Sequence, residues 1–221
     1  LEFRRVLFRF GKQGKVFHDG IDGWADAGLP IEKNPSALPP VAVKLVPQPQ
    51  LVVSNEEMRK LYNNKSVQVI DARTVNEYKG NDIRAIRGGH IPGALSIPYE
   101  QNWKDPQTAS KLAKKEVKNN AGMSLKNKEE LNQLYTNLDP NKETVVYCQS
   151  GVRASETATV LQNLGFKKVK IYDSSWLGWA SHLASPVADE TYLNVGLMNA
   201  RMSAMQNKIN ELEAALKASK N

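Results

Sequence analysis

Residues 144–155 read TVVYCQSGVRAS, and their pattern indicates the fold class. The segment 144–147 is a run of β-branched and aromatic residues of the kind found in buried strands. A polar turn that contains Gly151 follows directly, and a helical pattern then runs over 154–164 and stops at Gly165. A strand that passes through a short turn into a helix is the repeating unit of a parallel α/β sheet.

The same alternation extends on both sides of this stretch. The sequence predicts further strands at 67–70, 95–97 and 169–172, and helices at 54–62 and from Ser124 or Asn127 to Leu138. The first helix begins with an S-x-x-E capping box formed by Ser54 and Glu57. Asp71 and Cys148 each follow a predicted strand directly. Because functional sites lie at the carboxyl ends of parallel strands, we expect both side chains at one edge of the sheet.

The turn after the central strand contains Cys148, the one cysteine of the chain. A thiolate at the start of a helix is stabilised by free backbone N–H groups and by the helix dipole, and Arg153 adds a nearby positive charge. Gly151 allows several amides to converge on one point. These features predict a sulfur nucleophile that attacks or carries an anionic group. The alternative is a buried structural cysteine, which the polar and cationic turn disfavours.

Four motifs, in this order along the chain, resemble those of the rhodanese sulfurtransferases. They are Asp71-Ala72-Arg73, GHIPGA at 89–94, the Cys148 loop and YDSSW at 172–176. The resemblance covers about residues 54–187. It implies an α/β rhodanese-like domain, in which a central parallel sheet is flanked by helices on both faces.

The resemblance also implies a reaction. Cys148 takes a sulfane sulfur from a donor (thiosulfate, 3-mercaptopyruvate or polysulfide) and passes it from a persulfide to a thiol or cyanide. The transfer needs no metal and no organic cofactor, because the covalent intermediate divides it into two steps. The backbone amides that cradle the outer sulfur belong to Gln149, Ser150, Gly151, Val152 and Arg153. This C-x4-R loop is one residue shorter than that of the rhodanese-like phosphatases, which disfavours a phosphatase. The rival interpretation is a non-catalytic rhodanese-like module that carries sulfur or serves in an assembly.

By the same resemblance, supporting or substrate-binding roles fall to Asp71, Arg73, Arg87 and Trp176. Asp71 and Arg73 are expected to form a structural ion pair that braces the site. Trp176 either walls the pocket or fills the core. His90 is expected to make a hydrogen bond that locks a turn.

The sulfur donor stays open for a specific reason. Related tandem enzymes usually place a donor-binding arginine at the position that Glu77 occupies here, and this carboxylate repels an anionic donor if it faces the site. Arg84, Arg87 or Arg153 could compensate for that charge. Ser150 resembles the loop of the mercaptopyruvate-type enzymes more than that of the thiosulfate-type enzymes.

Two distant segments share a pattern of strand, turn, tryptophan-bearing helix and proline. They are GKVFHDGIDGWADAGLPI at 14–31 and KVKIYDSSWLGWASHLASPV at 168–187. The first resembles the end of another rhodanese domain, so we expect 11–34 to be the tail of an upstream domain of a tandem protein, whose body is truncated. Residues 1–10 resemble a translated sequencing adapter, the alternative being a basic arm that meets a membrane or partner. The proline-rich segment 35–53 is expected to link this tail to a catalytic domain at 54–187.

Residues 188–221 are expected to form a C-terminal helix. Its apolar residues are spaced by four and three residues in alternation, as in a coiled coil: Met198, Met202, Met205, Ile209, Leu212 and Leu216. This pattern predicts either a homo-oligomer that pairs through residues 196–221 or a helix that docks on its own domain.

Composition excludes several classes of protein. No run approaches the roughly 20 apolar residues of a membrane-spanning helix. The single cysteine excludes a disulfide framework, and the three histidines are too scattered for a metal cluster. The net charge is +7, but the lysine-rich stretch 104–128 contains no arginine and no aromatic residue, with Trp103 only at its edge, so we expect no nucleic-acid partner. The compartment stays open, although the resemblance to bacterial tandem enzymes favours the periplasm over the cytoplasm.

Overall fold

The computed structural model describes residues 19–34, 39, 42 and 48–218 of the protein. The chain divides into two compact units, one that ends at Thr191 and one that begins at Tyr192. Each unit is described by itself below.

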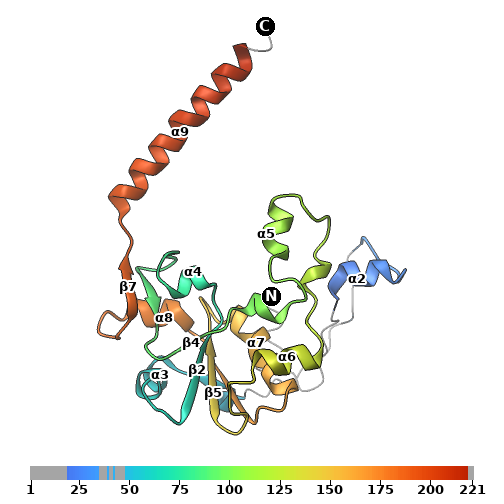
Figure 1. The fold of residues 1–221 in the computed structure, drawn as a ribbon, viewed down its shortest axis with the longest axis vertical. Coiled ribbons are helices and arrows are strands. Elements are labelled where there is room, and N and C mark those ends of the chain that lie inside the picture. Colours follow the sequence, from blue (N-terminus) through green and yellow to red (C-terminus); the bar gives the residue numbers. More distant parts are fainter. Residues whose placement is uncertain (1–18, 35–38, 40–41, 43–47, 219–221) are drawn as a thin grey trace. The chain divides into compact units, whose positions relative to one another are not determined.

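The first unit is built on a five-stranded sheet in the order β1-β6-β5-β2-β4 (Figure 1). Every neighbouring pair is parallel. The strands are β1 (Val52–Val53), β2 (Val67–Asp71), β4 (Leu95–Ser96), β5 (Glu143–Tyr147) and β6 (Lys168–Tyr172). The parallel sheet and the four predicted strands are therefore confirmed. Asp71 lies opposite Tyr147 in the register, which places Asp71 and Cys148 at the same edge, as expected.

Helices cover both faces of this sheet, as predicted (Figure 1). They are α3 (Asn55–Leu61), α4 (Val75–Tyr78), α5 (Thr108–Ala113), α6 (Lys128–Leu134), α7 (Val152–Asn163) and α8 (Ser175–Ser181), with 3-10 turns η1 (Pro49–Leu51), η2 (Tyr99–Asn102) and η3 (Ala121–Met123). Successive strand residues point to opposite faces, so β5 contributes to two cores. Val145 packs with Met58 and Trp179 from α3 and α8, whereas Val146 packs with Leu131 and Leu161 from α6 and α7.

Three of the helices begin with a complete capping box. The pairs are Ser54 with Glu57, Thr74 with Glu77, and Asn127 with Glu130. The helix expected to run to Leu138 begins after Asn127 and ends at Leu134. It stops early because the N–H of Leu138 donates to the Tyr135 carbonyl, and this turn buries both side chains in the core.

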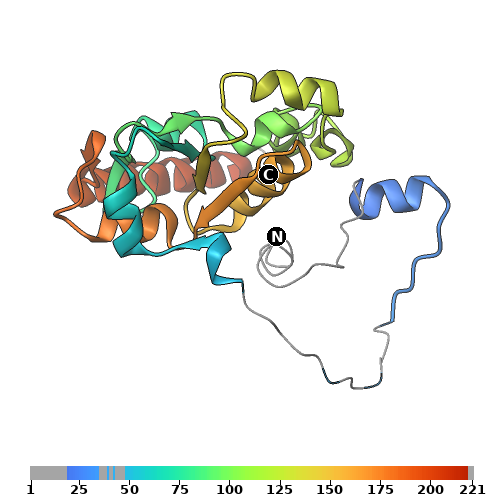
Figure 2. The same cartoon turned by 90° about the horizontal axis from the view of Figure 1, so that it is seen from below.

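A second sheet pairs β3 (Arg87–His90) with β7 (Ala188–Tyr192) and was not predicted. The strands approach so closely that a Cβ on Gly89 would collide with the Ala188 carbonyl. Residues 188–191 therefore belong to the sheet-containing unit, which ends at Thr191. The expected linker 35–53 likewise ends in structure, since β1 pairs with β6 (Figure 2).

The described segment 19–34 contains one helix. This is α2 (Gly20–Asp26), and the indole N–H of Trp24 donates to the Pro30 carbonyl at 2.9 Å. In the second copy of the repeat, the indole of Trp179 donates to the Pro186 carbonyl at the same distance. The strand expected at the start of the first copy, within residues 14–18, and the adapter-like residues 1–10 lie outside the described residues.

The second unit contains α9 (Val195–Ala218). This helix buries none of its described residues, and Met205 and Leu212 are 66% and 59% exposed. Across the described parts of the chain, no helix combines the length and apolar character that crossing a membrane requires.

Candidate active site

Cys148 lies between the end of β5 and the start of α7, where the sequence placed it. The residue is buried, with 1% of its surface exposed. Gly151 adopts a left-handed conformation (φ +87°) as the residue before α7, which turns the chain sharply into the helix. The first N–H groups of a helix have no partners within it, so the start of α7 supplies free backbone donors directly after Cys148 in the chain.

The turn is held in place by the start of α8. The backbone N–H of Cys148 donates to Ser175 Oγ at 3.1 Å, and the Cys148 carbonyl accepts from the N–H of Trp176 at 2.9 Å. The carbonyl of Gln149 accepts from the N–H of Leu177 at 3.1 Å. Ser175 has a positive φ of 50°, a conformation that is rare for a residue with a side chain. Ser175 lies in the YDSSW motif, but its contact with Cys148 was not predicted, because it depends on how α8 packs against the turn.

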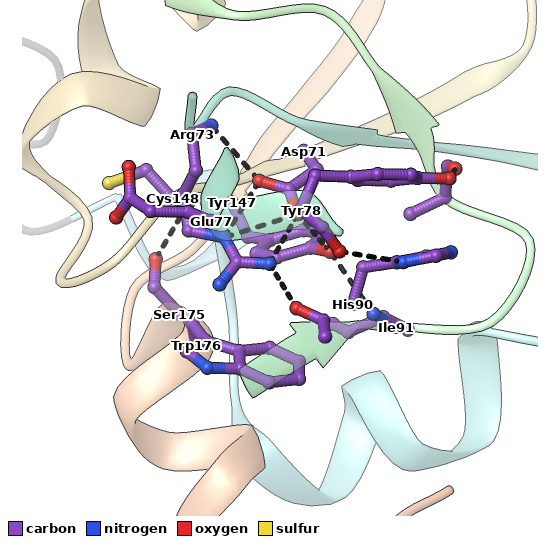
Figure 3. Close-up of polar contacts among 12 residues, drawn as sticks. Asp71, Arg73, Glu77, Tyr78, His90, Ile91, Tyr147, Cys148, Ser175 and Trp176 are labelled. Atoms are coloured by element: carbon purple, nitrogen blue, oxygen red, sulfur yellow. Dashed lines mark hydrogen bonds and ion pairs between the residues drawn. The ribbon is translucent and has the colours of Figure 1, made fainter. Parts of the chain in front are cut away.

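A buried polar network lies beneath the turn and joins Asp71, Arg73 and Tyr147 (Figure 3). The Arg73 guanidinium lies 2.6 Å from the Asp71 carboxylate, and the Tyr147 hydroxyl donates to the same carboxylate at 2.6 Å. The ion pair expected from the sequence is thus present, with both side chains at most 1% exposed. The sequence indicates only a strand residue at Tyr147, so its hydrogen bond with Asp71 was not predicted.

This network connects the sheet to its neighbours. Arg73 also donates to the Gly89 carbonyl at 2.7 Å, and its guanidinium lies 4.4 Å from the ring centre of Trp176. The indole of Trp176 donates to the Arg87 carbonyl, and the Tyr147 hydroxyl accepts from the N–H of Ile91. Trp176 is buried and belongs to the core cluster that also contains Tyr147 and Trp179.

The Arg153 guanidinium is bound by Glu77 through two hydrogen bonds. Arg153 Nη1 lies 2.7 Å from Glu77 Oε2, and Nη2 lies 2.8 Å from Oε1. The Glu77 side chain is 1% exposed and that of Arg153 is 14% exposed. The Glu77 carboxylate is therefore not a free negative charge at the site, because it neutralises Arg153, the one cation of the cysteine turn.

This pair sets the protonation of Glu77. Burial by itself raises the pKa of the carboxyl, but the hydrogen bonds and charge of Arg153 and the backbone hydrogen bond from Thr74 outweigh it and lower the pKa to about 2. Burial lowers the pKa of Arg153, yet the contacts with Glu77 dominate and raise it above its ordinary value. Both groups are therefore charged at neutral pH.

The lowered pKa of Glu77 makes stability depend on pH in a defined window. The carboxyl titrates near 4.5 when unfolded and near 2 when folded, so its contribution is complete above about pH 4.5 and is lost as the pH falls towards 2. We expect this contribution to reach about 3 kcal/mol of unfolding free energy. Urea unfolding from neutral to acidic pH measures it. In Glu77→Gln this part of the acid-induced loss should be absent, and an unchanged pH dependence would contradict the assignment.

The remaining residues named from the sequence, Arg87, Arg84 and His90, have other partners. Arg87 is buried and donates to the carbonyls of Ala180, His182 and Ser185 and to the Glu190 carboxylate, so its charge holds the chain before and within β7 rather than the cysteine turn. Arg84 is 54% exposed and lies 3.4 Å from Glu77. His90 Nδ1 lies 3.0 Å from the Tyr78 carbonyl and its ring stacks on Tyr78, which agrees with a role in the turn.

Two residues of η2 complete the surroundings of Arg153. The Arg153 guanidinium lies 5.4 Å from the ring centre of Tyr99. Burial raises the pKa of the neighbouring Glu100, and one of its carboxylate oxygens is buried without a described hydrogen-bond partner. No local motif marks these residues, because they reach the site only through the packing of η2 on α7. Within the described ranges, no group of three or more His, Cys, Asp or Glu side chains could hold a metal ion.

The geometry agrees with a comparison to known protein families. The model of the rhodanese-like domain matches residues 54–182, which is more than half of the chain. The chain belongs to the rhodanese-like family. The match begins at the capping residue of α3 and ends just after α8, so it includes the cysteine turn and the elements that hold it.

Curated rhodanese relatives extend the match beyond this domain. A thiosulfate sulfurtransferase of Corynebacterium glutamicum is 32% identical over 186 residues, covering 78% of this chain and 56% of that protein. The thiosulfate sulfurtransferase YnjE of Escherichia coli is 28% identical over 192 residues, covering 83% and 42%. The chain thus spans about half the length of these relatives.

Solved structures show the same rhodanese fold. The anaerobic ergothioneine biosynthesis enzyme of Chlorobium limicola, in complex with trimethyl histidine, matches with a TM-score of 0.68 at 20% identity. The match covers 87% of this chain and 45% of that one. A related structure, which contains a cysteine persulfide with ergothioneine, matches with a TM-score of 0.69.

Proposed function

We propose that this protein is a sulfurtransferase that carries sulfane sulfur as a persulfide on Cys148. The observation that carries the proposal is the cysteine turn itself: the one cysteine of the chain lies at the end of a central strand and the start of α7, and its backbone is fixed by α8. The thiosulfate sulfurtransferases among the relatives support the same reaction class.

The transfer proceeds in two displacements. The Cys148 thiolate attacks the outer sulfur of a donor such as thiosulfate, a Cys–S bond forms, and sulfite leaves with the electron pair of the broken S–S bond. Cyanide or a thiolate then attacks the outer sulfur of the persulfide, and the Cys148 thiolate leaves. The backbone N–H groups at the start of α7 stabilise negative charge on the persulfide in both steps. Neither displacement requires a metal or an organic cofactor.

Steady-state kinetics test this two-step scheme. The donor is varied at several fixed concentrations of cyanide. We expect parallel double-reciprocal plots, because the donor product leaves before the acceptor reacts. Thiocyanate formation is the readout. Intersecting plots would contradict a free persulfide intermediate. Absence of turnover with thiosulfate, 3-mercaptopyruvate and polysulfide, in protein whose cysteine still alkylates, would favour the non-catalytic carrier or assembly module.

We also propose that residues 11–34 correspond to the end of a second rhodanese-like unit in a tandem protein. The support is the shared pattern of the repeat together with two equivalent hydrogen bonds, from Trp24 to Pro30 and from Trp179 to Pro186. One extra residue lies between tryptophan and proline in the second copy, yet the indole reaches the same carbonyl. The segment from α3 to β7 is then the catalytic unit.

A further proposal concerns α9, which we infer pairs in parallel with α9 of a second copy. In the heptad of this helix, Ile209 occupies an a position and Leu212 a d position, a combination that favours two-stranded parallel coiled coils. Lys208 at g and Glu213 at e of the next heptad have opposite charges and face each other across such a dimer. Three methionines in the seam make the pairing adaptable and weak.

Sedimentation of single variants measures the pairing. Ile209→Lys places a charge in the seam. We therefore expect it to raise the dissociation constant of the dimer at least about tenfold. Asn210→Lys adds the same charge one residue away, at an outward b position, and should leave the dissociation constant within about twofold. A monomer in the unmodified protein at high concentration, or equal effects of the two variants, would refute the dimer.

A further inference from the structure

We propose that Glu77 determines which sulfur donors the site accepts, by cancelling the charge of Arg153 and so disfavouring donors with two negative charges. This inference rests on the proposed function and adds a substrate class to it. The donor class that fits is a sulfane sulfur or thiol compound with at most one negative charge, such as 3-mercaptopyruvate, and thiosulfate is the disfavoured dianion.

The first support is the completeness of the ion pair. Both Glu77 oxygens accept from Arg153, at 2.7 and 2.8 Å. Oε2 also accepts from the backbone N–H and the hydroxyl of Thr74, both at 3.1 Å. The carboxylate is thus fixed by the capping box of α4 and the guanidinium by the carboxylate. An incoming anion cannot engage the guanidinium as a free bidentate partner without displacing Glu77.

The second support is the sum of charges around the turn. Arg153 contributes one positive charge and Glu77 one negative charge, and the Cys148 thiolate adds a further negative charge to the same site. Glu100 places a partly buried carboxyl near Tyr99 and Arg153, close enough for its charge to act on both. Of the described cations, Arg84 is the next to contact this cluster, at 3.4 Å from Glu77 and half in solvent. Arg153 and Glu77 thus cancel each other's charge beside the amides at the start of α7, and solvent screens the charge of the exposed Arg84.

The consequence grows with the charge of the ligand. Coulomb energy is proportional to the product of the charges, so cancelling one guanidinium costs a dianion twice what it costs a monoanion. At an effective dielectric constant of about 20 to 40, one such charge several ångströms away changes a monoanion's binding or reaction by about tenfold. A thiol reagent of one charge is therefore a sufficient probe.

Glu77→Gln is the test variant, because glutamine at this position of a capping box preserves the local fold. The measured quantity is the ratio of the rate constants with which iodoacetate and iodoacetamide alkylate Cys148. The two reagents are nearly the same size and meet the same barrier to a buried thiol, so their ratio reports charge alone. We expect the ratio to rise about tenfold in Glu77→Gln. Glu57→Gln and Glu130→Gln, which remove equivalent carboxylates from the boxes of α3 and α6, should leave it unchanged.

A second variant keeps the test independent of how well the first one folds. Arg153→Gln leaves the Glu77 carboxylate with the more distant and exposed Arg84 as its cationic partner, and is expected to lower the ratio about tenfold. The double variant, which removes both charges, should return the ratio to within about twofold of the original. A ratio that does not move in either single variant would overturn the proposal.

Donor kinetics then separate this inference from the proposed function. Glu77→Gln is expected to lower the KM for thiosulfate about tenfold more than the KM for 3-mercaptopyruvate, with cyanide as acceptor. Equal changes for both donors would overturn the role of Glu77 in donor choice. If neither the unmodified protein nor any variant turns over either donor, but the alkylation ratios change as expected, the proposed function is rejected. The electrostatic role of Glu77 is then still supported.

Discussion

Cys148→Ser is expected to reduce sulfur transfer by at least about three orders of magnitude while the domain still folds. A serine hydroxyl is not ionised at neutral pH and cannot hold the transferred sulfur, so the covalent route is lost. Because Cys148 is buried in the core beside α7, the new hydroxyl should cost about 1 to 2 kcal/mol of unfolding free energy. Thiocyanate formation and thermal unfolding measure the two effects.

The mechanism requires that Cys148→Ser loses sulfur transfer but keeps its folded state. A Cys148→Ser protein that keeps more than a few per cent of the transfer rate would place the chemistry elsewhere. Loss of activity together with loss of the folded state would be uninformative in this variant, and Cys148→Ala then replaces it. Alanine adds no polar group to the core, so any loss of transfer in that variant reports the sulfur alone.

Arg73→Met is expected to be the most destabilising substitution near the site, at about 3 to 5 kcal/mol. The change leaves the Asp71 carboxylate buried without its guanidinium, and it removes the contacts of Arg73 with the Gly89 carbonyl and the Trp176 ring. Breaking a buried ion pair on one side is costly, since the remaining charge is neither solvated nor compensated. Urea unfolding at neutral pH measures the loss.

Lys60→Met provides the matched control for this prediction. Lys60 and Glu56 form an ion pair of similar length, 2.7 Å, but both side chains are more than 70% exposed. Removing that lysine should change the unfolding free energy by less than about 1 kcal/mol. Similar values for Lys60→Met and Arg73→Met would show that burial of the Asp71 network contributes little, contrary to its proposed role beneath the cysteine turn.

The sheet and the cysteine turn were predictable because their signals are local. A run of β-branched residues, a glycine and a helical pattern follow each other within residues 144–155, and the structure places β5, the turn and α7 there. The capping box at Ser54 was predicted from spacing alone, and the same spacing occurs at Thr74 and Asn127. The role of Glu77 in the capping box of α4 was not predicted, although its spacing from Thr74 permits it.

The parts that were not predicted depend on contacts between distant residues. β3 contains two glycines and two polar residues, and it becomes a strand only because β7 pairs with it about a hundred residues later. Tyr147 reaches Asp71, and Ser175 reaches Cys148, across neighbouring strands and loops. The ion pair of Glu77 and Arg153 joins residues 76 positions apart. No spacing rule in the sequence connects such pairs.

The most direct test of the central proposal is the intact mass of the protein after exposure to a sulfur donor. The protein is incubated in turn with thiosulfate, 3-mercaptopyruvate and polysulfide, desalted and weighed, and then treated with cyanide. We predict a gain equal to one sulfur atom, located by peptide mapping at Cys148, the one cysteine of the chain, and removed by cyanide. A protein that gains no sulfur from any donor, while iodoacetamide still modifies Cys148, would contradict the persulfide mechanism.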